Sequence, residues 1–586
     1  MLLPLSIWIL ISGLDDMVLD IVYAWHAIIR RSGRQLPSET ELRDEKEAPI
    51  AIFVPLWHEH RVIARMIEHN AAAIQYRNYR FFVGAYSNDE PTIAVVRDLE
   101  KRFANVHLCL VPHPGPTSKA DCLNWIYEHM QLYEERHRQH FDIVMTHDAE
   151  DIIHPASLRW VNFYAATHGM VQVPVVPLPT PWWKVTHGVY CDEFSESHTK
   201  DMRVRQWTGS FVPSCGVGTG FTRTALERLA AVKGGKIFEP VCLTEDYENG
   251  LSLHLLGEKQ IFVPLVFRED SFVATRELFP QTFCSAVKQR TRWVMGISLQ
   301  GWERHGWQGS WVDKYWLWRD RKGLLGNPLS VLTNAISVYA LTRWVLGNFD
   351  DSHWTFGRIV RMSHLKYLLW ATFALGLFRL IVRAVSSARI YGWWFAIGAP
   401  LRTWWANGIN SLAACNAIYR YARARLQKKQ HVWLKTDHAY PTQSALSGPW
   451  RKLGEVLVSL GYVTEAQLQQ ALTTKPDDLR LGRHLVKLGC IKEDQLFEGV
   501  RRQQSLAAGR LSPSEVKTNV ARSLPFKVIR DWRMLPFKVE MGNLFLAGPE
   551  FPTEEMRKDL RRFTSLEIRF QLITPANFAE LTKEFL

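Results

Sequence analysis

An acidic turn near residue 150 carries side chains of the kind that bind divalent cations. Asp148, Glu150 and Asp151 follow directly after FDIVMT, a short β-rich run at 141–146. Carboxylates one residue apart on an extended turn project together, which suits a hard cation that also takes oxygens from a diphosphate. A strand-to-helix turn capped by Asp or Glu would contain the same residues, so this turn does not by itself decide a function.

Polar residues also follow two earlier apolar runs. IAIFVP at 50–55 is followed by Trp57 and Glu59, and RFFVGA at 80–85 is followed by Asp89. Buried strands that alternate with helices predict an α/β fold with a parallel sheet, in which ligands bind at the carboxyl ends of the strands. The helical patterns between these runs lie at 60–75 and 119–135.

Two further motifs follow along the chain, Thr244-Glu245-Asp246 and then Gln289-Arg290-Thr291-Arg292-Trp293. Each has a plain structural explanation when it is taken alone. Asp246 is the kind of acid that begins a helix, Asp89 is a polar turn residue, and Trp293 suits a membrane interface. It is the order of the motifs along one chain that favours a function.

In this order, the strand-end Asp, the acidic turn, TED and QxxRW resemble the signature of processive family 2 glycosyltransferases. That class includes the bacterial cellulose and hyaluronan synthases, and the resemblance covers residues 48–310. It implies a Rossmann-like GT-A domain, a UDP-sugar donor, and Mg²⁺ or Mn²⁺ on the diphosphate. The sequence departs from the family at Glu150, which stands where the second Asp is usual.

The resemblance also implies a role for each matching residue. Asp246 would be the general base that takes the proton from the acceptor hydroxyl, with Glu245 beside it. Asp148 and Glu150 would hold the metal, and Asp151 would share that role. The implied donor residues are Pro55, Trp57, Glu59, Asp89, Lys119, Asp121 and Asp148. The implied residues for the acceptor and diphosphate are Gln289, Arg290, Arg292 and Trp293.

Two loops are expected to shape the acceptor side. One is the proline-rich run VPVVPLPTP at 173–181, and the other is the glycine loop CGVGTG at 215–220. A glycine-rich loop before a helix can bind phosphate, but this one matches neither a Walker nor a dinucleotide pattern. A simple tight turn explains it equally well.

The C-terminal part contains a repeat, in which LGEVLVSLGYVTEAQL at 453–468 returns as LGRHLVKLGCIKEDQL at 481–496. Each copy predicts two short helices around a glycine. The repeat resembles the MshEN domain of type II secretion ATPases, which binds cyclic di-GMP. Residues 524–586 are expected to complete a small α+β domain, with strands at 524–529 and 534–548.

The resemblance implies that cyclic di-GMP acts as an activator through these motif positions. In the first copy, Lys452 stands for the leading Arg and Lys475 stands where Gln is expected, and Lys is a less directional phosphate ligand than Arg. A small helical module for protein interaction is the alternative. The implied contacts are Arg451, Lys452, Leu453, Gly454, Gly461, Leu468, Leu472, Arg480, Leu481, Gly482, Leu485, Gly489, Leu496 and Gln503.

Three segments are apolar and long enough to span a bilayer, at 2–29, 323–347 and 365–385. Basic residues just after the first span and just before the second predict that the chain between them is cytoplasmic. The Trp-rich segment 390–418 is expected to lie in the interface, because only then does the basic stretch that follows it return to the cytoplasm. The carboxylates of Asp15, Asp16 and Asp20 are expected to face other helices or the outer edge of the membrane.

Length and charge set the wider limits. A chain of 586 residues needs several domains, which we place at 1–47, 48–310, 311–420, 421–448 and 449–586. The net charge of +13 predicts anionic partners such as phospholipid surfaces and nucleotides. Eight scattered cysteines without a zinc spacing predict reduced thiols and no structural metal.

The whole combination resembles the phage-adsorption class of bacterial inner-membrane glycosyltransferases. It implies a multi-pass enzyme, with cytoplasmic catalytic and C-terminal domains, that polymerises a sugar, by family tendency an N-acetylhexosamine, into an exported exopolysaccharide. The implied partners are an outer-membrane export protein, membrane lipids and a possible second copy of the chain, with no nucleic acid polymer. The alternatives are an inert scaffold or receptor, and an enzyme that adds a single sugar to a lipid carrier.

Overall fold

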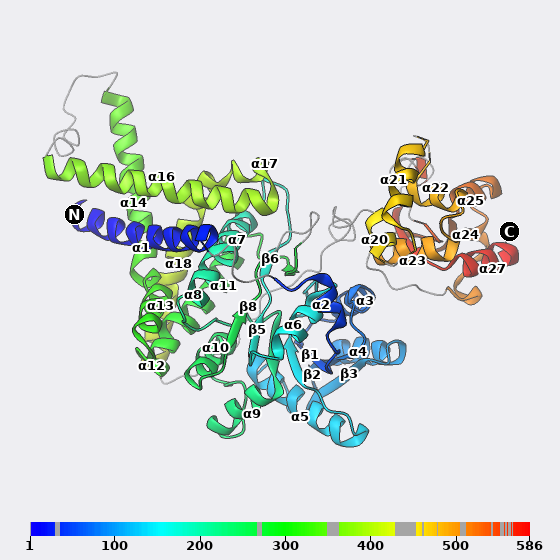
Figure 1. The fold of residues 1–586 in the computed structure, drawn as a ribbon, viewed down its shortest axis with the longest axis horizontal. Helices are drawn as coiled ribbons and strands as arrows, with labels where there is room; N and C mark the ends of the chain where they lie inside the picture. The colour runs from blue at the N-terminus through cyan, green and yellow to red at the C-terminus, as the bar shows by residue number, and fades with distance from the viewer. Residues whose placement is uncertain are drawn as a thin grey trace. The chain divides into compact units, whose positions relative to one another are not determined.

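The computed structural model describes residues 2–29, 36–265, 272–347, 363–427 and most of 453–585, where the gaps are 460–461, 477–478, 504–510, 541–542, 551, 553–555, 557–558, 561–563 and 565. The chain divides into two compact units (Figure 1). One consists of most of residues 1–441, and the other is mainly Thr442–Leu586.

The first unit is built on a mixed β-sheet, which confirms the predicted α/β fold. Its strand order is β3-β2-β1-β4-β7-β5-β8. The first four strands are parallel, whereas β7 runs antiparallel to both β4 and β5. The strands are β1 (Ile50–Pro55), β2 (Tyr79–Tyr86), β3 (Val106–Val111), β4 (Ile143–Thr146), β5 (Met170–Gln172), β7 (Thr219–Thr222) and β8 (Gln260–Phe262).

The apolar runs predicted as strands form β1, β2 and β4, and almost all of their residues are buried. Helix α5 packs against β1, β2 and β3 and completes this core. Helices of this unit are α2 (Glu39–Asp44), α3 (Ile63–Ala73), α4 (Glu90–Arg102), α5 (Lys119–His137), α6 (Ser157–Ala165), α7 (Val185–Glu196), η2 (Ser197–Asp201), α8 (Met202–Trp207), α9 (Arg223–Val232), α10 (Glu245–Leu255), α11 (Phe283–Trp293), η3 (Val294–Gln300), α12 (Gly301–His305) and α13 (Trp311–Arg321).

A second, two-stranded sheet pairs β6 (Val175–Pro177) with β9 (Thr275–Glu277) in parallel. The backbone of Arg276 in β9 also bridges to Ile152, the residue after the acidic turn, by N···O distances of 2.8 and 3.0 Å. This bridge brings β9 beside the acidic turn, although the two lie far apart in the sequence.

In the part of the chain that the structure describes, three helices are long and apolar enough to cross a membrane, within the stretches Leu2–Ala27, Gly323–Arg343 and Leu365–Tyr391. They belong to α1 (Leu2–Ile29), α14 (Gly323–Gly347) and α16 (Ser363–Tyr391), at the positions predicted from the sequence. The Trp-rich segment forms α17 (Trp393–Ala396) and α18 (Ala399–Leu426), and α18 packs against α7, α11 and α14. Helix α18 therefore connects the long apolar helix α14 to α11, the helix that carries QxxRW.

The carboxylates of α1 face other helices, as the sequence predicts. Asp15 accepts a hydrogen bond at 2.6 Å from Tyr315 of α13, and Asp16 lies 2.9 Å from Arg319, also on α13. Asp20 pairs with Lys200 of η2. Because each acid has a basic or hydroxyl partner, α1 can hold them within an otherwise apolar segment.

In the second unit, each copy of the repeat folds as two helices, as predicted. A Cβ on Gly454 would collide with Leu468, and one on Gly482 would collide with Leu496, so the two copies pack in the same way. The repeat contains α20 (Leu453–Ser459), α21 (Glu465–Thr474), α22 (Leu481–Lys487) and α23 (Glu493–Gln503). After it come η4 (Pro513–Glu515), α24 (Thr518–Ala521), α25 (Phe526–Trp532), β10 (Leu535–Glu540), β11 (Asn543–Gly548), β12 (Glu567–Leu572) and α27 (Pro575–Phe585).

One secondary-structure prediction is wrong in this unit. The segment 524–529 was expected to be a strand but forms the start of α25, while 534–548 forms β10 and β11 as expected. Pro525 occupies the N-cap, and Arg533 ends the helix in the left-handed conformation. Ile529 is fully buried in the core of the C-terminal half, so tertiary packing overrides the β propensity of Val and Ile.

Candidate active site

The acidic turn after β4 is held by Asp151. Its Oδ2 lies 2.7 Å from Nδ1 of the buried His147 and accepts a hydrogen bond from the backbone N–H of Asp148 at 3.0 Å. Burial raises the pKa of Asp151, and the His147 contact opposes that rise. This geometry commits Asp151 to shaping the turn, which leaves Asp148 and Glu150 as the better candidates for metal ligands.

Lys119 connects the acidic turn to the TED motif. As the first residue of α5, it places its Nζ 2.5 Å from Oδ1 of Asp148. Burial alone would lower the pKa of Lys119, but the charges of Asp148, Glu245 and Asp246 outweigh it and raise the pKa. Three carboxylates from two separate elements therefore converge on one ammonium group.

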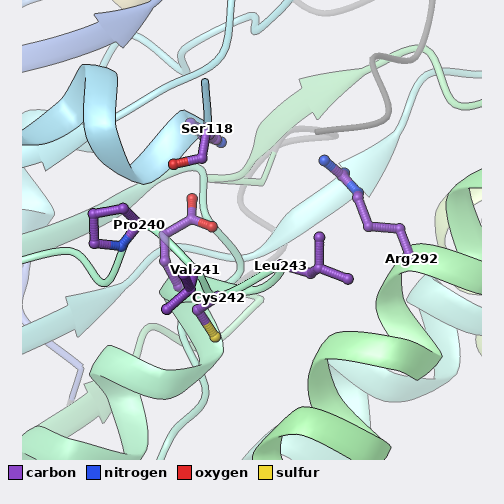
Figure 2. A pocket seen from close by; sticks show the side chains of 8 residues that line it. Ser118, Pro240, Val241, Cys242, Leu243 and Arg292 are labelled. Carbon is purple, nitrogen blue, oxygen red and sulfur yellow. The ribbon is translucent and has the colours of Figure 1, made fainter. Parts of the chain in front are cut away.

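A pocket opens beside this cluster (Figure 2). Ser118, the N-cap residue of α5, and Arg292 of α11 approach it from different elements, as Figure 2 shows. The pocket thus combines a hydroxyl, two cations and a carboxylate. Its lining residues are Ser118, Lys119, Pro240, Val241, Cys242, Leu243, Glu245 and Arg292.

The TED motif lies at the start of α10. Burial and the neighbouring charge of Asp246 raise the pKa of Glu245 to about 7, and burial also raises the pKa of Asp246. Gly216 adopts a φ of 78° and lies so close to Asp246 that a Cβ there would collide with the carboxylate. The glycine loop therefore lies next to the candidate base.

The candidate metal ligands can hold a divalent cation only together with oxygen atoms of the substrate's diphosphate. Among the described residues, no group of three or more His, Cys, Asp or Glu has the geometry to hold a metal ion alone. Glu277, which the sequence did not single out, lies near the turn: burial raises its pKa, and the charges of Asp151, Glu150 and Asp148 raise it further. A hard cation bound by Asp148, Glu150 and diphosphate oxygens would relieve this repulsion.

Several implied donor residues support the loops of the site. The buried Asp89 accepts a hydrogen bond from the backbone N–H of His58 at 2.6 Å, which fixes the turn after β1. Asp121, in the first turn of α5, accepts a hydrogen bond at 2.6 Å from the hydroxyl of Thr117, which precedes that helix. Trp57 packs edge-on against Tyr86, with ring centroids 5.4 Å apart. Pro55 ends β1, and Glu59 is buried in the turn that follows it.

The QxxRW motif divides its residues between two environments. Arg292 lines the pocket, whereas Arg290 is buried, 2.7 Å from Glu193 and 2.6 Å from the side-chain oxygen of Asn410 on α18. Trp293 joins an aromatic cluster with Tyr190 and Phe279. The geometry therefore favours Arg292 for the diphosphate and gives Arg290 a structural position. Gln289 is half-buried on the same helix.

In the C-terminal repeat, most motif residues form the core. Leu468, Leu485 and Leu496 are buried, and Leu453 and Leu481 pack against them. Arg480 is half-exposed at the start of α22, Leu472 is exposed, and Gly489 has a φ of 72°. Arg480 is therefore the best placed of the described motif residues for a ligand. Arg451, Lys452, Gly461 and the side chain of Gln503 lie outside the described residues.

The comparisons with known proteins agree with the family 2 motifs, whereas the match to the MshEN domain begins after the repeat. Residues 48–296 match the family described as glycosyltransferase like family 2, and residues 505–586 match the MshEN domain. Bacteriophage adsorption protein B of Escherichia coli strain K12 is 34% identical over 592 residues, which cover 97% of this chain and 79% of that protein. The chain belongs to the bacteriophage adsorption protein B family. Bacteriophage N4 adsorption protein B of E. coli O157:H7 shows the same identity and coverage.

Two solved structures are also similar. Mannosyltransferase PcManGT from Pyrobaculum calidifontis, in complex with GDP-Man and Mn²⁺, is 17% identical, with a TM-score of 0.41 over 69% of this chain and 99% of that chain. MshE with cdg is 26% identical, with a TM-score of 0.20 over 23% of this chain and 99% of that chain. The match to the family 2 model shows that this member of the adsorption protein B family is a glycosyltransferase.

The two arginines of QxxRW are expected to respond differently to mutation. Arg292→Ala should reduce sugar transfer by about 100-fold and leave Tm unchanged, because Arg292 faces the pocket and would stabilise the leaving diphosphate. Arg290→Ala should lower stability by about 3 kcal/mol, because it leaves Glu193 without its buried partner. Thermal unfolding and UDP release of both variants test this. A stable but inactive Arg290→Ala would contradict the assignment.

The pH dependence of transfer should reflect the raised pKa of Asp246. The base works only as a carboxylate, and burial raises the pKa of Asp246, so the rate should fall as the pH drops through that raised pKa. In Glu245→Gln this acid limb should remain, because burial is the main cause of the raised pKa of Asp246. Initial rates between pH 4 and 9 measure this, and an acid limb at the ordinary pKa of an Asp would contradict the assignment.

Proposed function

We propose that this protein is an inner-membrane, inverting glycosyltransferase that polymerises a sugar from a UDP-sugar into an exported exopolysaccharide and is activated by cyclic di-GMP. The observation that carries the proposal is the convergence of Lys119, Glu245 and Arg292 on one pocket. Asp148 pairs with Lys119 there, and the charge of Asp246 also acts on this lysine. An N-acetylhexosamine is the preferred donor sugar, on family resemblance.

The chain's own residues account for the reaction. Asp246 takes the proton of the acceptor hydroxyl, and the hydroxyl oxygen forms a bond to the anomeric carbon of the donor. The bond from that carbon to the diphosphate breaks, and its electron pair leaves with UDP, with inversion at the carbon. Lys119 and Arg292 stabilise the charge that develops on the diphosphate. Mg²⁺ or Mn²⁺ at Asp148 and Glu150 would neutralise part of the same charge.

The membrane arrangement supports synthesis at the inner face of a membrane. Helix α11 carries Arg292 and packs against α18, which in turn packs against α14. The active site is thereby fixed to the helices that are long enough to span. We propose that α1, α14 and α16 cross the bilayer, that α18 lies in its interface, and that both globular domains are cytoplasmic. An outer-membrane export protein would take the polymer onward, and a second copy of the chain would help to form the conduit.

The C-terminal domain supports regulation by cyclic di-GMP. Arg480 lies half-exposed at the start of the second repeat helix, where its guanidinium can bind a phosphate. The name of the similar protein, bacteriophage adsorption protein B, further supports a role in phage adsorption for the exported product or its exporter.

The length of the product separates this proposal from its two alternatives. Membranes containing the protein are incubated with a radiolabelled UDP-sugar and cyclic di-GMP, and the products are separated by size and by extraction into organic solvent. The proposal predicts a water-soluble polymer. A single sugar in the lipid fraction would favour transfer to a lipid carrier, and no incorporation by folded protein would favour an inert scaffold.

A further inference from the structure

Strand β9 directs alternate side chains toward the active site. Successive residues of a strand point to opposite faces, so Thr275 and Glu277 share a face that Arg276 does not. Thr275 is fully buried and lies against Gly218, where a Cβ would collide with its hydroxyl. Glu277 therefore extends from the same face as a residue that contacts the glycine loop.

Beyond Glu277, the chain continues into the aromatic cluster of QxxRW. Phe279 stacks on Tyr190 with ring centroids 4.8 Å apart, and Trp293 lies 6.5 Å from it. Glu277 lies two residues before Phe279, and its charge helps to raise the pKa of Tyr190, whose ring contacts Trp293 at a centroid distance of 6.1 Å. Glu277 therefore lies near the aromatic cluster that contains Trp293, the residue expected to contact the acceptor sugar.

Glu277 also lies beside the acidic turn and near the glycine loop that contacts Asp246. The bridge between Arg276 and Ile152 places it opposite the acidic turn. Gly216, in the same loop that β9 contacts, lies against Asp246. The pKa of Cys215 is raised by burial and then by the charges of Asp246 and Glu277, which agrees with both carboxylates lying near this loop.

We infer that Glu277 binds the acceptor sugar, by a hydrogen bond to a hydroxyl group next to the one that reacts, and so directs the nucleophile toward Asp246. This inference rests on the proposed function. A carboxyl group is suited to the task because sugar hydroxyls hydrogen-bond well to it, and Trp293 nearby offers an apolar surface to the sugar ring.

A comparison of sugar transfer to water with sugar transfer to a saccharide distinguishes acceptor binding by Glu277 from a role in binding the donor or the metal. Glu277→Met has a similar length but cannot hydrogen-bond, and Glu277→Gln restores the hydrogen bonds. UDP release from the preferred UDP-sugar is measured with water alone and with increasing oligosaccharide made by the wild-type protein. Glu227→Gln is the control, because Glu227 is half-exposed on α9 and pairs there with Arg223.

Glu277→Met should raise the KM for the oligosaccharide by about 10- to 100-fold, with UDP release in water close to that of the wild type. Glu277→Gln should recover most of the loss, and Glu227→Gln should behave as the wild type. An unchanged KM in Glu277→Met would overturn the inference, as would an equal loss of hydrolysis and transfer. A folded wild-type protein that releases no UDP would contradict the proposed function as well.

Discussion

Replacement of Asp246 by Asn is expected to lower sugar transfer by about 100- to 10,000-fold, the range that a general base contributes. Asn has nearly the same shape but cannot accept the acceptor's proton. The residue occupies the first turn of α10, where Gly216 leaves room for its carboxylate. Donor binding and folding should survive, because the contacts of Lys119 with Asp148 are retained. UDP release and incorporation of labelled sugar measure the effect.

The control for this variant is Asp98→Asn. Asp98 is largely exposed on α4 and makes only a surface pair with Arg102 at 3.5 Å, so the same chemical change there should leave the rate unaltered. Asp246→Asn should also bind cyclic di-GMP like the wild type. Transfer at the wild-type rate in folded Asp246→Asn would rule out Asp246 as the base.

Arg480→Ala is expected to weaken cyclic di-GMP binding by about 10- to 100-fold, since a charge-assisted hydrogen bond to phosphate is lost. The substitution removes a half-exposed side chain at the N-cap of α22, which lies 3.7 Å from Glu550. Donor affinity and the rate without the dinucleotide should not change. Calorimetric titration of the purified full chain with cyclic di-GMP measures the loss.

Arg483→Ala provides the matched comparison. Arg483 lies on the same helix, outside the motif, and pairs with Glu550 at 2.8 Å. Loss of this charge should reduce affinity only a few-fold, through the general field of the surface. Equal affinities of Arg480→Ala and the wild type would mean that the repeat is a structural or protein-binding module.

The sequence was most informative where short-range patterns decide the structure. The apolar runs at 50–55, 80–85 and 141–146 became β1, β2 and β4, because buried parallel strands are nearly continuous apolar segments. The three long apolar helices and the two-helix repeats were also predictable, because each is encoded by a pattern of apolar residues within one short stretch of sequence. The acidic and TED motifs were recognised because each is local in sequence.

Features that depend on long-range contacts could not be predicted in this way. Glu277 comes near the acidic turn only because Arg276 pairs with Ile152 across more than a hundred residues. Arg290 and Arg292 are two residues apart on one helix, so they point to different sides, toward α18 and toward the pocket. Helical phase gave a signal for that difference, whereas nothing local indicated β9 or the helix at α25.

The convergent site should transfer a sugar under the control of the C-terminal domain. The most direct measurement is UDP release from membranes containing the protein, across a panel of UDP-sugars with Mg²⁺ or Mn²⁺, with and without cyclic di-GMP. We predict release from one donor, at a rate that rises with the dinucleotide. No UDP release under any of these conditions, from protein shown to be folded, would contradict the account.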